Sequence, residues 1–338
     1  MNTRMSTNRT ADTMKWLLRR EFWEHKGSMF WAPLIVGAVL VVLMGCTITY
    51  GILQHGIPAH VTINGQTLHH ARLDQILPDE TKLMVAKIAT GMYLGAGLPL
   101  FAILTGVVFF YCLGALYDER RDRSILFWKS LPVSDPVTVL SKAVTAMVVA
   151  PAITLVLAII ASLAQIVIVG LVLSTQGLNL LPSLFASSGL YLSPLRLIAL
   201  LPVYVVWALP TVGWLMLVSS WAKSKPFMWA VGVPVVALIV IKWINAALES
   251  FSGQTLLLSH YAGDVVARIL GGIVPGIWFT YQPRLLAGMP ISGNGVDMSG
   301  VVSQSYLSLA GIDAWIGVAL GVVMLVAAVR MRRWRDEG

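Results

Sequence analysis

The chain has 338 residues, of which 57% are hydrophobic and 12% charged, and its formal net charge is +8. Soluble domains have about 45–50% apolar and about 25% charged residues, so this composition excludes an ordinary water-soluble globular protein. The apolar excess is typical of a protein in lipid, and the positive charge then indicates basic loops on one side of a membrane rather than nucleic-acid binding.

The N-terminal segment, residues 13–27, has the pattern of an amphipathic helix. Met14, Leu17, Leu18 and Phe22 recur at i, i+3, i+4 and i+8, with charged residues between them. Such a helix lies in the membrane interface, with its apolar residues in the acyl boundary and its basic residues at the headgroups. A juxtamembrane anchor without a partner contact is the alternative. The residues singled out in this segment are Trp16, Leu17, Arg19, Arg20, Phe22 and Trp23.

Six apolar stretches approach the roughly 20 residues that a helix needs to cross a hydrocarbon core of about 30 Å. They cover residues 30–53, 88–116, 143–173, 197–221, 227–244 and 315–329. The first lacks a cleavage site before a mature domain, so it is predicted to be a retained signal-anchor helix. The third is long enough that it must tilt, kink near Pro151 or project from the bilayer. We therefore predict an all-α integral membrane protein with one transmembrane domain of six helices, residues 1–338.

Two segments on the predicted external side are longer than connections need to be. In residues 54–87, the alternating residues 61–63 stand next to Asn64 and Gly65, which predicts a small hairpin. Residues 245–313 include an apolar portion, 256–273, that Asp264, Arg268 and glycines interrupt. This portion favours an interfacial or re-entrant helix over a seventh span.

The loop after the second stretch, residues 117–135, combines charge with an apolar cluster. Six charged residues at 118–123 precede four apolar ones at 125–128, and Pro132 ends the segment. An exposed cluster of this kind is typical of a protein contact; the alternative is a solvated loop whose aromatic residues enter the membrane interface. The candidate contact residues are Asp118, Glu119, Arg120, Arg121, Ile125, Leu126, Phe127, Trp128, Leu131 and Pro132.

An aromatic stripe follows the fourth stretch, where tryptophans recur every seven residues at 207, 214 and 221. An ideal helix drifts only about 20° per heptad, so these residues share one face. They line a path for an apolar substrate, or they face lipid or a neighbouring helix. The candidate pathway residues are Tyr204, Trp207, Thr211 and Trp214.

Basic residues set the predicted orientation. Seventeen of the 24 Lys and Arg residues fall before the first stretch, in the second and fourth connections, and after the sixth stretch. The positive-inside rule therefore places both termini in the cytoplasm, which agrees with an even number of spans.

The sequence shows no source of energy of its own. The apolar cores of the six stretches contain no Asp, Glu, Lys, Arg or His, with Lys242 and Asp313 only at helix ends. A proton-driven transporter is therefore disfavoured, although backbone carbonyls could still bind sodium. There is no P-loop, no catalytic motif and no metal-ligand spacing. We expect no metal, no cofactor and no enzyme activity in this chain, and energy supplied by another subunit.

The 118–135 segment resembles the E-R-x-x-G-[ST]-hydrophobic-x-x-x-x-L-P-[VI]-S segment of ABC-2-type exporter permeases. The matching residues are Glu119, Arg120, Ser124, Leu131, Pro132, Val133 and Ser134, and Arg123 replaces the usual glycine. The N-terminal helix is similar to the elbow helix of that family, and the loop is similar to its cytoplasmic coupling helix. Six spans with cytoplasmic termini also fit the topology of the family.

The resemblance implies a permease subunit in the bacterial cytoplasmic (inner) membrane. Its partners would be a second permease copy or a paralogue, membrane lipids, and two P-loop ATPase subunits that hold ATP and Mg²⁺. Residues 125–128 would fill a groove on the ATPase, and Glu119, Arg120 and Arg121 would fix the register through ion pairs at its rim.

Without charged residues along the spans, we expect the substrate to be hydrophobic or amphipathic, such as a drug, a lipid or a small peptide. An ion-coupled secondary transporter or a channel is the alternative function. A membrane-embedded enzyme or a structural assembly factor is a further class, and the missing catalytic constellations disfavour the enzyme.

Overall fold

The computed structural model describes residues 2–55, 61–63, 66–68, 79–122, 133–175, 178–252, 257–287, 291–292, 295–296 and 298–334. This part of the chain is helical apart from two short hairpins. It contains six helices that are long and apolar enough to cross a membrane, at Gly27–Gly51, Lys82–Arg121, Asp135–Thr175, Ser188–Trp221, Met228–Phe251 and Ile312–Trp334. The predicted helical membrane protein with six candidate spans is confirmed at this level.

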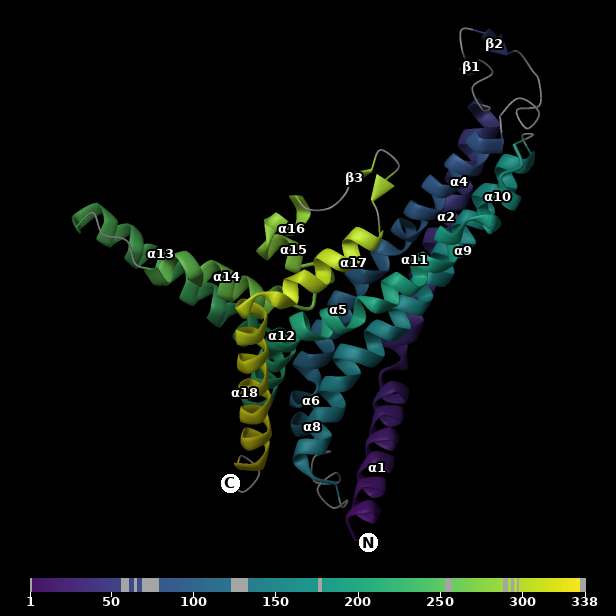
Figure 1. Ribbon diagram of the computed structural model, residues 1–338. Helices are drawn as coiled ribbons and strands as arrows, with labels where there is room; N and C mark the ends of the chain where they lie inside the picture. Colours follow the sequence, from purple (N-terminus) through teal and green to yellow (C-terminus); the bar gives the residue numbers. More distant parts are fainter. Residues whose placement is uncertain are drawn as a thin grey trace.

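Both ends of the described chain lie at the same end of the bundle, which we call the terminal end (Figure 1). The hairpin of β1 (Val61–Ile63) and β2 (Gln66–Leu68) lies at the other end, the distal end. Its strands pair antiparallel, with Ile63 opposite Gln66, so the predicted hairpin is confirmed. This arrangement is the one expected for an even number of crossings.

The N-terminal helix is longer than the sequence pattern indicated. Helix α1 (Asn2–Glu24) leads through a π-helical turn (η1, Gly27–Trp31) into α2 (Ala32–His55). The expected elbow, residues 13–27, therefore covers the last part of α1 and the short turn at His25 and Lys26 that leads to η1.

The second span changes helix type where α4 meets α5. Helix α4 (Asp79–Met92) begins within the segment expected to be an external loop, and a 3₁₀ stretch (η2, Tyr93–Gly97) joins it to α5 (Leu98–Gly114). Pro99 lies in the first turn of α5, where its missing N–H costs no helical hydrogen bond. Helix α6 (Tyr117–Arg121) follows after a short turn.

The third span is longer than the predicted stretch and changes helix type beside Pro151. Helix α8 (Asp135–Val144) begins eight residues before the predicted start of the span, and a π turn (η3, Thr145–Val149) joins it to α9 (Ala150–Thr175). Pro151 follows this turn directly. Because proline cannot donate to the preceding turn, the wider π turn is a way to accommodate it.

Helix α12 (Leu201–Trp221) forms the centre of the bundle, after α10 (Leu181–Ala186) and α11 (Ser188–Ala199). The fourth predicted span began at 197, within α11. Thirteen residues of α12 are buried, and the largest is Trp207 at 1% exposure. Apolar side chains of α5, η3 and α18 pack against α12.

The predicted external segment 245–313 contains several short elements. Its elements are the end of α13 (Val233–Ser252, preceded by η4, Met228–Gly232), α14 (Leu257–Gly271), α15 (Trp278–Tyr281), α16 (Pro283–Ala287), the hairpin β3 (Ile291–Ser292) and β4 (Gly295–Val296), α17 (Met298–Leu307) and η5 (Ser308–Ala310). Helix α18 (Ile312–Trp334) then runs to the terminal end.

Helix α14 is not among the six candidate spans and packs beside α13 and α12 (Figure 1). At its C-terminal end, the N–H of Gly272 donates to Thr211, midway along α12, at 2.9 Å. Helix α14 is thus no seventh candidate span, and its interfacial or re-entrant placement stays a prediction.

Helices α12 and α18 approach each other closely at two glycines. A Cβ on Gly213 would lie 2.6 Å from the carbonyl oxygen of Gly321, and a Cβ on Gly321 would lie 2.8 Å from the carbonyl oxygen of Leu209. Both contacts are with backbone, which cannot rotate away. Glycine at both positions is therefore needed for this helix pair.

We predict that Gly213→Ala destabilises the folded chain by about 1–3 kcal/mol, because the added methyl group forces the two backbones apart. Thermal unfolding in detergent measures the effect. Gly106→Ala is the control, because its Cβ would meet no heavy atom within 4 Å and alanine favours a helix by up to about 1 kcal/mol. Equal unfolding midpoints for the two variants would contradict the close crossing.

Candidate functional site

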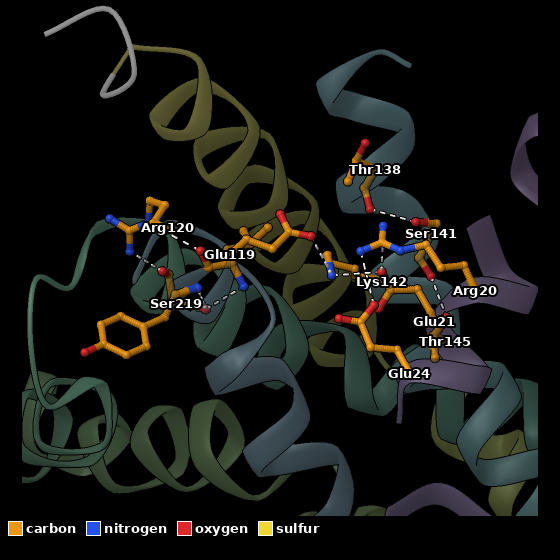
Figure 2. Close-up of polar contacts among 12 residues, drawn as sticks. Arg20, Glu21, Glu24, Glu119, Arg120, Thr138, Ser141, Lys142, Thr145 and Ser219 are labelled. Carbon is orange, nitrogen blue, oxygen red and sulfur yellow. Dashed lines mark hydrogen bonds and ion pairs between the residues drawn. The ribbon is translucent and has the colours of Figure 1, made fainter. Parts of the chain in front are cut away.

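A network of buried charges lies at the terminal end of the bundle. Its centre is Lys142 of α8, whose Nζ lies 2.9 Å from Oε1 of Glu21 in α1 and 3.1 Å from Oε1 of Glu119 in α6. The hydroxyl of Tyr111 in α5 donates to the other oxygen of Glu21 at 2.8 Å. Figure 2 shows Glu21 and Glu119 on either side of Lys142. One ammonium thus links three segments that are distant in sequence.

The network extends to the C-terminal helix through Arg332. Its Nη1 lies 2.9 Å from Oε2 of Glu119, and its Nε donates to Asp135 at the start of α8 at 3.1 Å. We call Glu21, Lys142, Glu119, Arg332 and Asp135 the ion network. Four of its five side chains are at most 8% exposed, and Asp135 is 25% exposed. The ion network therefore holds α1, α6, α8 and α18 together.

Burial makes each member depend on its partners. Removing a charge from water is costly, and the cost is offset only while the opposite charge stays in contact. Burial alone raises the pKa of the Glu21 carboxyl. The charge and hydrogen bond of Lys142, with the Tyr111 hydrogen bond and the charge of Arg20, outweigh this effect and hold the pKa below its ordinary value of 4.5. Glu21 is accordingly an anion in the folded chain at neutral pH.

Helix α6 is fastened to the end of α12 by Arg120 and Ser219. Nη2 of Arg120 donates to the carbonyl oxygens of Ser219 at 2.6 Å and Ala222 at 3.0 Å. These carbonyls lie in the last turn of α12, where helical acceptors lack partners and a positive charge is favourable. In return, the Ser219 hydroxyl accepts hydrogen bonds from the N–H groups of Leu116 and Tyr117. The labels Arg120 and Ser219 mark this contact in Figure 2.

The residues expected to contact an ATPase fall into three groups. Glu119 and Arg120 are engaged within the chain, and their contact with an ATPase stays a prediction. Asp118 and Arg121 are more than half exposed and pair with each other at 3.6 Å. The remaining candidates lie outside the described residues, namely Ile125, Leu126, Phe127, Trp128, Leu131 and Pro132.

The N-terminal helix does not turn its predicted apolar face away from the protein. Leu17 is 2% exposed and Glu21 is buried one turn later, and this face packs against α8. Trp16 and Trp23 are 51% and 57% exposed, on the other side of the helix. Arg19 is also exposed, Arg20 pairs with Glu24 at 3.1 Å, and Phe22 packs edge-on against Trp23. The expected acyl-boundary role of Leu17 is wrong, because α8 covers it.

Sequence reasoning did not identify most members of the ion network. Lys142 and Arg332 were assigned to polar segments, because the third predicted span begins after Lys142 and the sixth ends before Arg332. One signal was present in the sequence: Glu21 stands one turn after Leu17 on the apolar face. A charge on such a face predicts a buried partner on another helix.

The candidate pathway residues are largely enclosed by protein. Tyr204, Trp207 and Thr211 are at most 4% exposed. The indole N–H of Trp207 donates to Ser308, and that of Trp214 donates to the carbonyl of Ala230. The stripe therefore packs α12 against its neighbours, and Trp207 also lines a cavity.

No model of a known protein family, no curated protein and no solved structure matches this chain. The resemblance of residues 118–135 to a permease segment therefore depends on those residues alone. Within the described ranges, no cluster of His, Cys, Asp and Glu could hold a metal ion. The contacts of the ion network hold four helices together.

We predict that Arg332→Gln destabilises the folded chain by about 3–5 kcal/mol, because Glu119 and Asp135 lose a buried cation. Arg333→Gln is the matched control, since this neighbouring side chain is exposed and its replacement should change stability by less than about 0.5 kcal/mol. Thermal unfolding of both variants in the same detergent measures the difference. An equal loss of stability in both variants would show that Arg332 contributes only to the net charge of the chain and not through its contacts with Glu119 and Asp135.

Acid should weaken the docking of α1. Because the pKa of Glu21 is lower in the folded chain than its ordinary value of 4.5, its stabilising effect is complete above that value and is lost as pH falls through the folded-state pKa. The midpoint temperature of thermal unfolding should therefore decrease as the pH is lowered below about 4.5. The decrease should be less steep in Glu21→Gln, which has no titrating group at this position. Glu24→Gln, at an exposed position, should keep the wild-type slope; a wild-type slope in Glu21→Gln would contradict the assignment.

Proposed function

We propose that this chain is the permease subunit of an ABC exporter of the ABC-2 type, which moves a hydrophobic or amphipathic substrate. In this proposal the terminal end is cytoplasmic, in a bacterial inner membrane. The energy comes from separate P-loop ATPase subunits that hold ATP and Mg²⁺, and a second permease copy or a paralogue completes the transporter. Six candidate spans, termini at one end and the 118–135 segment support it.

The proposal depends mainly on one observation: the ion network includes residues at both ends of the 118–135 segment. The described chain stops at residue 122 and resumes at 133, and the network has a member on each side of this interval, Glu119 and Asp135. Both bind Arg332 of α18. A force applied to residues 123–132 would therefore reach the last span directly.

The same force would reach three further helices. Lys142 links Glu119 to Glu21 of α1, and Arg120 links α6 to the end of α12. Buried ion pairs have little freedom to lengthen, because separation would leave a charge uncompensated in a low-dielectric site. The network would thus move as one body and transmit displacement to the spans rather than absorb it.

One observation favours the alternative of an ion-coupled transporter. Gln165 of α9 is 6% exposed, and neither its side-chain oxygen nor its nitrogen has a hydrogen-bond partner among the described residues. Helix α9 packs against η2, the break in the second span. Broken helices with free polar groups at membrane depth are where sodium-coupled transporters bind their ion. Sodium-driven transport by the isolated chain would select this alternative.

The decisive experiment is co-purification with a P-loop ATPase from the same cell, followed by reconstitution in vesicles. Phe127→Ala with Trp128→Ala should abolish complex formation and the stimulation of ATP hydrolysis, because these residues supply the apolar contact. Trp334→Ala is the control, since this exposed tryptophan lies at the same end outside the segment. Wild-type assembly and stimulation in the double variant would refute the coupling role of the segment.

A further inference from the structure

A cavity of about 310 Å³ lies between α12, α14 and α18, in the distal half of the bundle. Helix α14 supplies Tyr261, Asp264 and Val265 to one wall. Helix α18 supplies Asp313 and Leu320, among others, to the opposite wall, and Trp207 of α12 contributes to the lining between them. The cavity is separate from the ion network, which lies at the terminal end.

Polarity changes along the depth of the cavity. On α18 the lining residues Asp313, Ile316, Leu320 and Met324 recur every three or four positions, so they share one helix face. Asp313 lies at the distal start of this candidate span, and Met324 lies about 16 Å deeper at 1.5 Å per residue. A carboxylate therefore stands at the membrane boundary, above an apolar wall that reaches the middle of the span. This gradient matches a molecule with a polar head and an apolar tail.

Arg268 forms a wall of the cavity rather than a receptor for anions. Its guanidinium lies 4.4 Å from the centre of the Trp207 ring, and both terminal nitrogens donate to backbone carbonyls, those of Asp313 and Ala314. Gly317 makes room for it, because a Cβ there would lie 2.3 Å from Nη2. Its Nε is buried. The positive charge is thus held by the ring and the carbonyls, and little of the donor edge is open to a ligand.

The two carboxylates at the cavity are in a different situation. Asp264 and Asp313 are exposed and line the cavity. Asp313 acts electrostatically on Arg268, and Asp264 on Tyr281, but neither carboxylate forms a direct ion pair within the described part of the chain. Together they outnumber the single guanidinium in the lining. Tyr261 stands three residues before Asp264 on the same helix face, where its ring is 59% exposed. Carboxylates beside an aromatic ring favour an organic cation.

We propose that this cavity binds a cationic amphiphile, with its ammonium group at Asp264 and Asp313 and its apolar tail along Ile316, Leu320 and Met324. As a binding site, the proposal depends on the cavity alone. Only the further step, that such a molecule is the passenger, rests on the proposed permease function. Zwitterionic and anionic amphiphiles of the same tail length should bind more weakly. The two carboxylates repel an anionic headgroup, and they attract a zwitterionic headgroup less than a cationic one.

The test uses the purified full chain in lipid nanodiscs and three probes with one tail: dodecyltrimethylammonium, dodecylphosphocholine and dodecyl phosphate. The wild-type chain should bind the cation most tightly. Asp264→Asn with Asp313→Asn should weaken cation binding roughly tenfold, or about 1.4 kcal/mol, and leave the zwitterion unchanged. Glu249→Gln is the control, since this exposed acid on α13 lies outside the cavity, and it should bind all three probes like the wild type.

A second variant tests the apolar half without touching a charge. Leu320→Trp fills the deep part of the cavity and should weaken all three probes alike. Equal affinity of the wild-type chain for the three probes would overturn the proposal. Wild-type cation binding in the double Asn variant would also overturn it, and so would unchanged binding in Leu320→Trp. A chain that binds the cation as expected and yet associates with no ATPase would refute the permease function and leave the site intact.

Discussion

The contact on which the terminal end of the molecule depends is the ammonium of Lys142 between two buried carboxylates. Glu21 and Glu119 come from segments almost a hundred residues apart, and each lies within 3.1 Å of the same nitrogen. The ammonium offsets part of the cost of burying each charged carboxylate. Arg332 adds a second cation to Glu119 and draws in the C-terminal helix. The packing of α1, α6, α8 and α18 at this end therefore follows from one cluster of paired charges.

The two charged regions of the bundle are connected by one pair of helices. Helix α18 carries Arg332 near its terminal end and Asp313 at its distal start, and α12 carries both the acceptors of Arg120 and the ring of Trp207. Between these regions the two helices cross at Gly213 and Gly321 with their backbones in contact. Backbones in contact cannot be brought closer together. The same two helices thus line the cavity and hold residues of the terminal end.

Composition and the length of apolar stretches were enough to predict six candidate spans, since both reflect the hydrophobic thickness of a membrane. The β1–β2 hairpin was also predictable, because its turn residues Asn64 and Gly65 have a local preference. The ion network was not, because its partners meet only after folding. Lys142 stands at the edge of an apolar run, where a loop lysine and a buried one look alike in sequence. Similarly, the helix pattern of α1 predicted an apolar face but not that α8 covers it.

The short connection from α1 through η1 into α2 has a geometric consequence. Because only His25 and Lys26 separate α1 from η1, a tilt of α1 at the ion network would also tilt the first span. Helix α2 has 24 residues, which is roughly 36 Å of helix, so a rotation of about 5° at its base would carry its distal tip sideways by about 3 Å. Small rearrangements among five charged side chains would in this way be amplified at the opposite face of the bilayer.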